Sequence, residues 1–432
     1  MRKLVLILLC LCMTAGLAAC GKNHKDVQEA GKSGVELNFL VMPDIEKVSD
    51  VFKEYEKKNT DVKVNVESLP FDKMFEAIEV RLGAKEDSVD VLLVDAPMVA
   101  NYAAKGYLAD MSSYVDDESK GKITEASLGA GTIDGKLMAL PLNSSTVNLY
   151  YNKEIFKEKG IEVPSEDVDE RWTWERVVEA AKELTYEKDG RQIYGLCFEQ
   201  IGRPYQLLPL AQSLGAEEFV SEDGSKTEGY TNSEEMVKAC QFYYDTFNTW
   251  NISPKISADD AVSYFTGGQV AMFIGGPWQI PAMTEAGMDF GFAPHPYFEG
   301  GEVVTPTGSW YVGVSNYSKN KEEAAKFVEF ITTNDDACQM NYDIGKNLPC
   351  NIHVLEAIDH DPAYESFPDN SMKLAVYESI HTAKARPQMA GYAEWQSVME
   401  KAYSDIMNGS HPKEALDLAV SEIDKQLEKY KK

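Results

Sequence analysis

Near its start the chain repeats a strand–helix pattern that few folds accommodate. Apolar residues predict strands at 35–41, 62–66 and 89–94, and between them apolar residues recur at helical spacing over 48–55 and 71–82. Short links join these elements, as in a parallel sheet whose faces are covered by helices. The sequence therefore predicts an α/β fold.

Two acidic residues follow strands of this predicted sheet. Asp44 comes after the first strand and Asp95 after the third. Ligands of open α/β sheets bind at the carboxyl ends of the strands. We therefore expect both carboxylates to lie at a binding site.

A second α/β region is predicted after residue 141. One hydrophobic core rarely serves a chain of 432 residues, so two lobes are expected. From about residue 371 onward the pattern is helical throughout. Other expected elements are strands at 147–151, 194–198, 270–274, 290–293 and 310–314, and helices after the N-cap Thr173 and at 205–214, 234–248 and 322–333.

Residues 1–19 have the features of an export signal. Arg2 and Lys3 precede an apolar run at 4–13, and small residues lead to Cys20. The stretch LAACG around Cys20 resembles the bacterial lipobox, which implies cleavage before this cysteine and acylation of its thiol. An ordinary export signal with a chance cysteine is the alternative. The lipobox predicts an exported protein anchored by lipid to the outer face of the cell membrane.

The segment after the lipobox is polar. Residues 20–34 are bounded by glycines and have little to bury, so they are predicted to form a flexible tether before a globular body that begins at residue 35. No later stretch offers the roughly 20 apolar residues of a membrane-spanning helix.

The charge balance limits the partners. The chain has 70 Asp and Glu against 42 Lys and Arg, a formal net charge of −28. Such a polyanion repels nucleic acid phosphates and gains nothing from anionic lipid. We expect no nucleic acid partner and no membrane contact beyond the lipid anchor.

The cysteines of the folded body are Cys197, Cys240, Cys338 and Cys350. They are too widely spaced for a disulfide scaffold. A Cys338–Cys350 bridge and buried free thiols both remain open. The spacing typical of metal ligands is absent, and we expect neither a metal nor a cofactor.

The sequence lacks the common catalytic motifs. It has no G-x-S-x-G, no phosphate-binding G-x-x-x-x-G-K-[ST], no G-x-G-x-x-G, no H-E-x-x-H and no paired C-x-x-C. We therefore predict that it is not an enzyme. A glycoside hydrolase stays open, because among 70 acidic residues a carboxylate pair arises easily.

Two tryptophans stand in turns beside predicted strands. Trp278 follows Gly275-Gly276-Pro277, and Trp310 follows Gly308-Ser309. Exposed rings near polar side chains suit sugars, whose C–H faces pack on aromatics while their hydroxyls need hydrogen-bond partners. The alternative for each is core packing, which we expect for Trp172, Trp174 and Trp250.

Several stretches in unbroken order resemble the extracellular sugar-binding proteins of ABC importers, the maltose-binding-protein-like group of solute-binding protein family 1. The resemblance runs from about residue 35 to residue 427. The stretches are FKEYEKKN at 52–59, DVLLVD at 90–95, YAAKGYL at 102–108, DGK at 134–136, LYYNK at 149–153, GQVAM at 268–272, GPW at 276–278 and RPQM at 386–389.

This resemblance implies the type II periplasmic-binding-protein fold, two α/β lobes joined by a hinge of crossing segments near residues 143, 303 and 346, with a helical C-terminal region. It implies that the lobes close on a ligand held between them, and that a monomer then docks on the ABC permease. The implied first lobe is 35–142 plus 303–345, and the second is 143–302 plus 346–432.

The resemblance also implies ligand contacts. Asp95 is expected to accept hydrogen bonds from sugar hydroxyls, and Trp278 to stack on the sugar. Val94 and Met98 stand where the maltodextrin binders have aromatic and charged residues, which argues against maltose. The remaining expected cleft residues are Asn143, Ser144, Ser145, Glu199, Arg203, Tyr205, Ser309, Trp310, Arg386 and Met389.

The function predicted from the sequence is the carbohydrate receptor of an importer. Two alternatives remain, a binding protein for a peptide or cationic solute and a lipid-anchored glycoside hydrolase.

Overall fold

The computed structural model of the protein describes residues 34–308 and 310–430. The predicted export signal, Cys20, the tether up to residue 33, and Ser309 lie outside the described residues. In the described part of the chain, no helix is long and apolar enough to cross a membrane.

The first sheet has the strand order β2-β1-β3-β13-β6. β1 runs parallel to β2 and β3, which confirms the α/β unit predicted at the start of the chain. β13 runs antiparallel to β3 and places Trp310 opposite Asp95. The strands are β1 (Val35–Val41), β2 (Val62–Ser68), β3 (Val91–Asp95), β6 (Leu140–Pro141) and β13 (Trp310–Val314).

Helices cover this sheet with apolar faces. α13 packs on α2, β1 and β13, and Phe327 in α13 meets the rings of Phe39 and Phe52 edge to face. The helices and the small hairpin of this lobe are α1 (Pro43–Glu46), α2 (Ser49–Lys58), α3 (Phe71–Gly83), α4 (Met98–Lys105), α5 (Asp117–Gly121), α6 (Glu125–Ala130), α13 (Lys321–Thr333), α14 (Asp335–Gly345), β4 (Thr132–Ile133) and β5 (Lys136–Leu137).

The second sheet has the order β11-β7-β10-β9-β8. As predicted, Thr173 caps α8, because its hydroxyl oxygen accepts a hydrogen bond from Arg176 N. The strands are β7 (Asn148–Asn152), β8 (Tyr186–Lys188), β9 (Arg191–Phe198), β10 (Val270–Gly275) and β11 (Phe290–Ala293). The helices are α7 (Lys153–Lys159), η1 (Val168–Glu170), α8 (Trp174–Glu183), α9 (Pro204–Ser213), α10 (Glu234–Asn248), α11 (Ala258–Thr266), η2 (Pro277–Gln279) and α12 (Ile280–Glu285).

Three segments meet between the two sheets. Bridges join Ser145 to Gly308 and Ser144 to Leu348, so the segments expected near residues 143, 303 and 346 lie side by side. A further bridge joins Ile123 to Asn351, which ties the third segment to the first lobe. The residue limits of the lobes stay a prediction.

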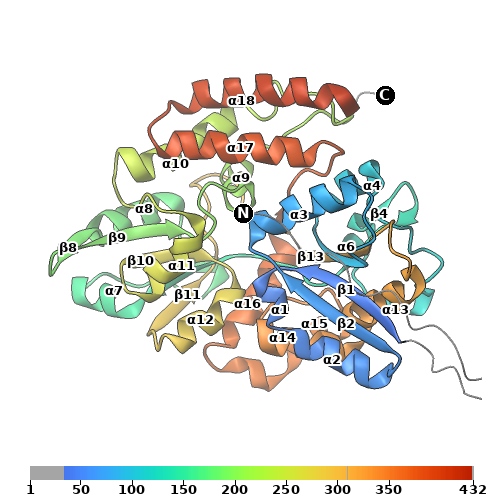
Figure 1. The fold of residues 1–432 in the computed structure, drawn as a ribbon. Coiled ribbons are helices and arrows are strands. Elements are labelled where there is room, and N and C mark those ends of the chain that lie inside the picture. The colour runs from blue at the N-terminus through green and yellow to red at the C-terminus, as the bar shows by residue number, and fades with distance from the viewer. Residues whose placement is uncertain (1–33, 309, 431–432) are drawn as a thin grey trace, which may run out of the picture. The chain divides into compact units, whose positions relative to one another are not determined.

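The C-terminal region is only partly helical. The sequence predicted helix from residue 371 onward, but this is wrong for residues 383–391. β14 (Ala383–Ala385) pairs in parallel with β12 (Thr305–Thr307), and Pro387 then disfavours helix. The helices here are α15 (Ile352–His360), η3 (Pro362–Glu365), α16 (Asn370–His381), α17 (Tyr392–Met407), α18 (Pro412–Leu427) and η4 (Glu428–Tyr430). α17 and α18 lie side by side, and α17 packs on α10 (Figure 1).

A buried ion pair fixes α16 near the crossing segments. Glu378 is fully buried and accepts a hydrogen bond from Arg171 Nη1 at 2.6 Å, and its Oε1 also accepts from His295 N at 3.3 Å. One turn on, the Thr382 hydroxyl lies 2.9 Å from the Thr305 hydroxyl of β12. Burial, and then the charge of Arg171, lowers the pKa of His295 to about 3, so its ring is neutral here. The network therefore carries one positive and one negative side chain.

The cysteines of the body are buried free thiols. Cys197, Cys240, Cys338 and Cys350 each lack a disulfide, so of the two readings left open for Cys338 and Cys350 the structure has the free thiols. Burial raises the pKa of each of these thiols, which disfavours the reactive thiolate.

Candidate functional site

A pocket of about 400 Å³ is lined by residues of both lobes. It lies at the carboxyl ends of β1 and β3, where the strand pattern predicted a ligand, and the crossing segments contribute to its wall. The predicted site residues that line it are Asp44, Asp95, Asn143, Ser145, Glu199, Arg203, Tyr205, Trp278, Trp310 and Arg386.

Two other predicted residues are not part of the lining. Ser144 instead donates its backbone N–H to Leu348 O at 2.6 Å, within the crossing segments. Met389 is buried, and its carbonyl accepts from Tyr392 N at 3.1 Å at the start of α17. Their contact with a ligand stays a prediction.

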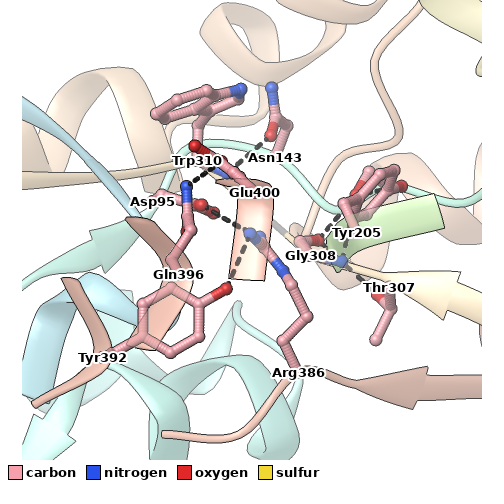
Figure 2. A network of polar contacts seen from close by, with 11 residues as sticks. Asp95, Asn143, Tyr205, Thr307, Gly308, Trp310, Arg386, Tyr392, Gln396 and Glu400 are labelled. Carbon is pink, nitrogen blue, oxygen red and sulfur yellow. Dashed lines mark hydrogen bonds and ion pairs between the residues drawn. The ribbon is translucent and has the colours of Figure 1, made fainter. Parts of the chain in front are cut away.

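An ion pair between Asp95 and Arg386 lies in this pocket (Figure 2). Arg386 Nη1 donates to Asp95 Oδ2 at 2.7 Å and Nη2 donates to Oδ1 at 2.5 Å, a bidentate arrangement. The side chains are only 7% and 10% exposed, and Tyr392 OH lies 3.3 Å from Nη1. Burial alone would lower the pKa of Arg386, but the charge of Asp95 raises it above its ordinary value. The sequence predicted that Asp95 accepts hydrogen bonds from sugar hydroxyls. In the structure, both of its carboxylate oxygens already accept hydrogen bonds from Arg386.

Hydroxyl and amide groups of the crossing segments form a second network. Tyr205 OH donates to Ser145 Oγ at 2.9 Å, and Ser145 Oγ donates to Gly308 O at 2.9 Å. Asn143 Oδ1 accepts from Trp310 N at 3.0 Å, while its Nδ2 has no partner among the described residues. A Cβ at residue 308 would lie 2.9 Å from Arg386 Nη2, so glycine there leaves room for the guanidinium.

Aromatic rings stand on both sides of the pocket. In the second lobe, the ring centroids of Trp278 and Tyr205 are 6.4 Å apart. In the first lobe, Trp310 lies 6.0 Å from Phe71. The two sides of the pocket meet at Arg203 and Phe71. The Arg203 guanidinium lies 4.1 Å from the Phe71 ring centroid, within cation–π range.

The two turn tryptophans differ from the others in their surroundings. Trp278 and Trp310 are half-buried and line the pocket. Trp174 is fully buried in the core, and Trp172 and Trp250 pack partly buried against it. What separates the two turn tryptophans from Trp172 and Trp250, which are also half-buried, is that they line the pocket.

Glu199 follows β9 and is 7% exposed. Its carboxylate accepts hydrogen bonds from the Trp278 indole, the Gln279 amide and Gly276 N. Burial raises the pKa of Glu199 above its ordinary value, against the lowering effect of these three hydrogen bonds.

The sequence prediction missed Phe71 and Gln279, which also line the pocket. Two residues, Leu69 and Pro70, separate Phe71 from the end of β2. The rule that selected Asp44 and Asp95, the carboxyl end of a parallel strand, also applies to β2 and would have found it. Gln279 directly follows Trp278, but no pattern distinguishes it from other polar neighbours.

Comparisons with known proteins agree with this architecture. The bacterial extracellular solute-binding protein family matches residues 43–337. A galactooligosaccharide-binding protein of Bacillus subtilis is 26% identical over 427 residues, 97% of this chain and 96% of that protein. A maltodextrin-binding protein of the same organism is 26% identical over 414 residues, 92% of this chain and 90% of that protein.

Solved structures resemble the fold along nearly the whole chain. An ABC substrate-binding protein of Listeria monocytogenes in complex with cycloalternan superposes with a TM-score of 0.81 at 25% identity, covering 91% of this chain and 99% of that one. The Thermus thermophilus maltotriose-binding protein, at 23% identity, gives a TM-score of 0.75 over 90% of this chain and all of its own. The fold is thus the two-lobed α/β fold of these receptors, and the chain belongs to the bacterial extracellular solute-binding protein family.

Proposed function

We propose that this protein is the receptor of an ABC importer that captures a sugar or oligosaccharide between its lobes and delivers it to a membrane permease. The observation that carries the proposal is the pocket with aromatic rings on both sides and hydrogen-bonding groups between them. A sugar presents C–H faces to such rings and hydroxyls to the polar groups. The sugar-binding relatives support the same choice of ligand.

Binding between lobes explains how a ligand favours one conformation. A ligand stabilises the closed arrangement only by the contacts that it makes better there than in the open one. Trp310 belongs to the first lobe and Trp278 to the second, so one sugar chain that touches both rings gains these contacts on closure. The proposed monomer then presents its closed form to the permease.

Four carboxylates line the pocket, and we do not expect catalysis from the two that are buried, Asp95 and Glu199. A glycoside hydrolase needs one carboxyl group as acid and another as base or nucleophile beside the scissile bond. Asp95 is bound bidentately by Arg386, and Glu199 accepts three hydrogen bonds from its neighbours. Both are held by the protein itself, which favours a binding role.

The sugar proposal is tested by titrating residues 21–432 with maltose, maltotriose, galactobiose, cycloalternan, spermidine and a tripeptide. A bound sugar at 100 times its dissociation constant should add about 2.7 kcal/mol of stability, seen as a raised melting temperature. If spermidine or the tripeptide alone raises it, the ligand class is wrong; if chromogenic glycosides are cleaved, the receptor role is wrong.

Replacing Trp278 with alanine should weaken sugar binding roughly tenfold or more, a change of about 1.4 kcal/mol per factor of ten, because the ring face is lost. Isothermal titration with maltotriose and galactobiose measures the effect. Trp172→Ala is the matched control, since Trp172 is also half-buried but lies outside the pocket and stacks with Arg176. Equal losses for the two variants would contradict a role for Trp278 in binding.

Membrane attachment is proposed to depend on Cys20. Replacing Cys20 with serine should release the protein into the medium and reduce sugar uptake, because the acyl chains supply the anchor. Sugar affinity of the released protein should equal that of the wild type. Fractionation of cells with a globomycin-treated control measures this; a variant that stays with the membrane contradicts the anchor.

A further inference from the structure

The buried carboxylate of Glu199 is surrounded by neutral donors. Its Oε1 accepts from Trp278 Nε1 at 2.7 Å and from Gln279 Nε2 at 2.6 Å, and Oε2 accepts from Gly276 N at 3.0 Å. Among the described residues, no lysine or arginine forms an ion pair with it. A carboxylate has about four acceptor positions, and three of them are filled by a single turn of the chain.

The Trp278 ring also packs directly against the backbone of Gly276. A Cβ at residue 276 would lie 2.1 Å from the indole ring atoms, so the ring occupies the space that a side chain would need. Gly276 has φ −92° and ψ 163°, which any residue adopts, so the space and not the backbone requires glycine. The indole N–H is thus fixed by Glu199, and the ring itself lies against the glycine.

The same carboxylate determines which way the Gln279 amide faces. The Gln279 amide nitrogen donates to Glu199 Oε1, so its carbonyl oxygen points away from Glu199. This oxygen accepts no hydrogen bond from the part of the chain that the structure describes. Gln279 lines the pocket beside Trp278, so an aromatic ring and a free acceptor lie next to each other.

We propose that Glu199 is a positioning residue that acts on the ligand through Trp278 and Gln279 without touching it. Trp278 and Gln279, oriented by Glu199, together select a sugar unit that presents a C–H face to the indole ring and a donating hydroxyl to Gln279 Oε1. This deepens the proposed function and rests on it, and it replaces the direct ligand contact expected for Glu199 from the sequence.

The first test needs no ligand. In a ¹H–¹⁵N spectrum, Glu199→Gln should move the Trp278 indole resonance upfield, because a neutral amide cannot accept from all three donors at once. The Trp278→Phe variant identifies that resonance, and the Trp310 indole should not move. An unchanged Trp278 resonance would overturn the proposal, whatever the outcome of the sugar titrations.

The second test separates positioning from contact. Glu199→Gln should weaken binding of maltotriose or galactobiose about tenfold or more. In a Trp278→Phe, Gln279→Ala background, the same change should alter affinity by less than about twofold, because the groups through which Glu199 acts are gone. A full loss in that background would mean that Glu199 touches the sugar, and the proposal would fail.

Gly276→Ala provides an independent route to the same effect. It leaves Glu199 in place but occupies the space of the Trp278 ring, so it should also shift the indole resonance and weaken sugar binding. Glu322→Gln, in an exposed ion pair on α13, is the control and should change neither readout. If every variant binds no sugar and the wild type binds none either, the proposed function fails, while the indole resonance still decides the positioning role.

Discussion

Replacing Asp95 with alanine is expected to lower the free energy of unfolding by about 3–5 kcal/mol, the cost of leaving one member of a buried ion pair without its partner. The Arg386 side chain is 10% exposed and is bound bidentately by Asp95, so the variant strands a buried guanidinium. The pair also joins the end of β3 to the residue after β14, so the tie between the first sheet and the crossing segments is lost. Urea unfolding without sugar measures the change.

A double-mutant cycle identifies the cause of this loss. Asp95→Leu combined with Arg386→Met removes both charges and should recover most of the stability, because an apolar pair of similar size often replaces a buried ion pair without loss. The matched control is Glu322→Ala, which breaks the exposed pair with Lys326 and should leave stability nearly unchanged. If Asp95→Ala costs no more than this control, the pair does not stabilise the fold.

The second large effect is expected at Glu378. Glu378→Ala should also cost about 3–5 kcal/mol, because Arg171 is 5% exposed and would keep its charge without a partner. The unfolding transition should also become less cooperative, because Glu378 links several segments. Its carboxylate accepts from His295 N, and it stands one turn before Thr382, which contacts β12. Thermal unfolding followed by circular dichroism measures the change.

The conservative variant Glu378→Gln distinguishes charge from shape. It keeps an acceptor for Arg171 but removes the negative charge, so it should fall between wild type and Glu378→Ala. Exchanging Arg171 for methionine in the Glu378→Gln background should then restore part of the stability, because no buried charge remains. Equal stability of Glu378→Ala and wild type would show that the network contributes nothing.

The sequence predicted the elements best where local pattern and tertiary role agree. The strand at 310–314 was placed correctly because a glycine-containing turn precedes Trp310 and four apolar or small residues that are buried in the sheet. Residues 383–391 were predicted as helix because the helices on both sides set the local pattern. The local pattern is overridden by a parallel pairing with β12, whose residues lie 78 positions earlier in the chain, and no local signal reports this pairing.

The candidate site was predictable as a set of residues but not as a set of roles. Turn glycines indicated Trp278, and the strand ends indicated Asp95, and both line the pocket. Whether a pocket carboxylate meets a ligand or a protein group depends on distant residues. Asp95 and Arg386 are 291 positions apart, and Glu199 and Trp278 are 79 positions apart, so only the folded chain reveals these partners.

The position of β13 between β3 and β6 sets an order in time for the folding of the first lobe. β6 pairs only with β13 among the described strands, so the first sheet stays unfinished until residue 314 has left the ribosome, after all of β7 to β11. Contacts between residues so far apart form slowly, because a long loop must close first. Secretion through a translocation channel requires an unfolded chain, so the late completion of this sheet is compatible with export of a member of an extracellular family.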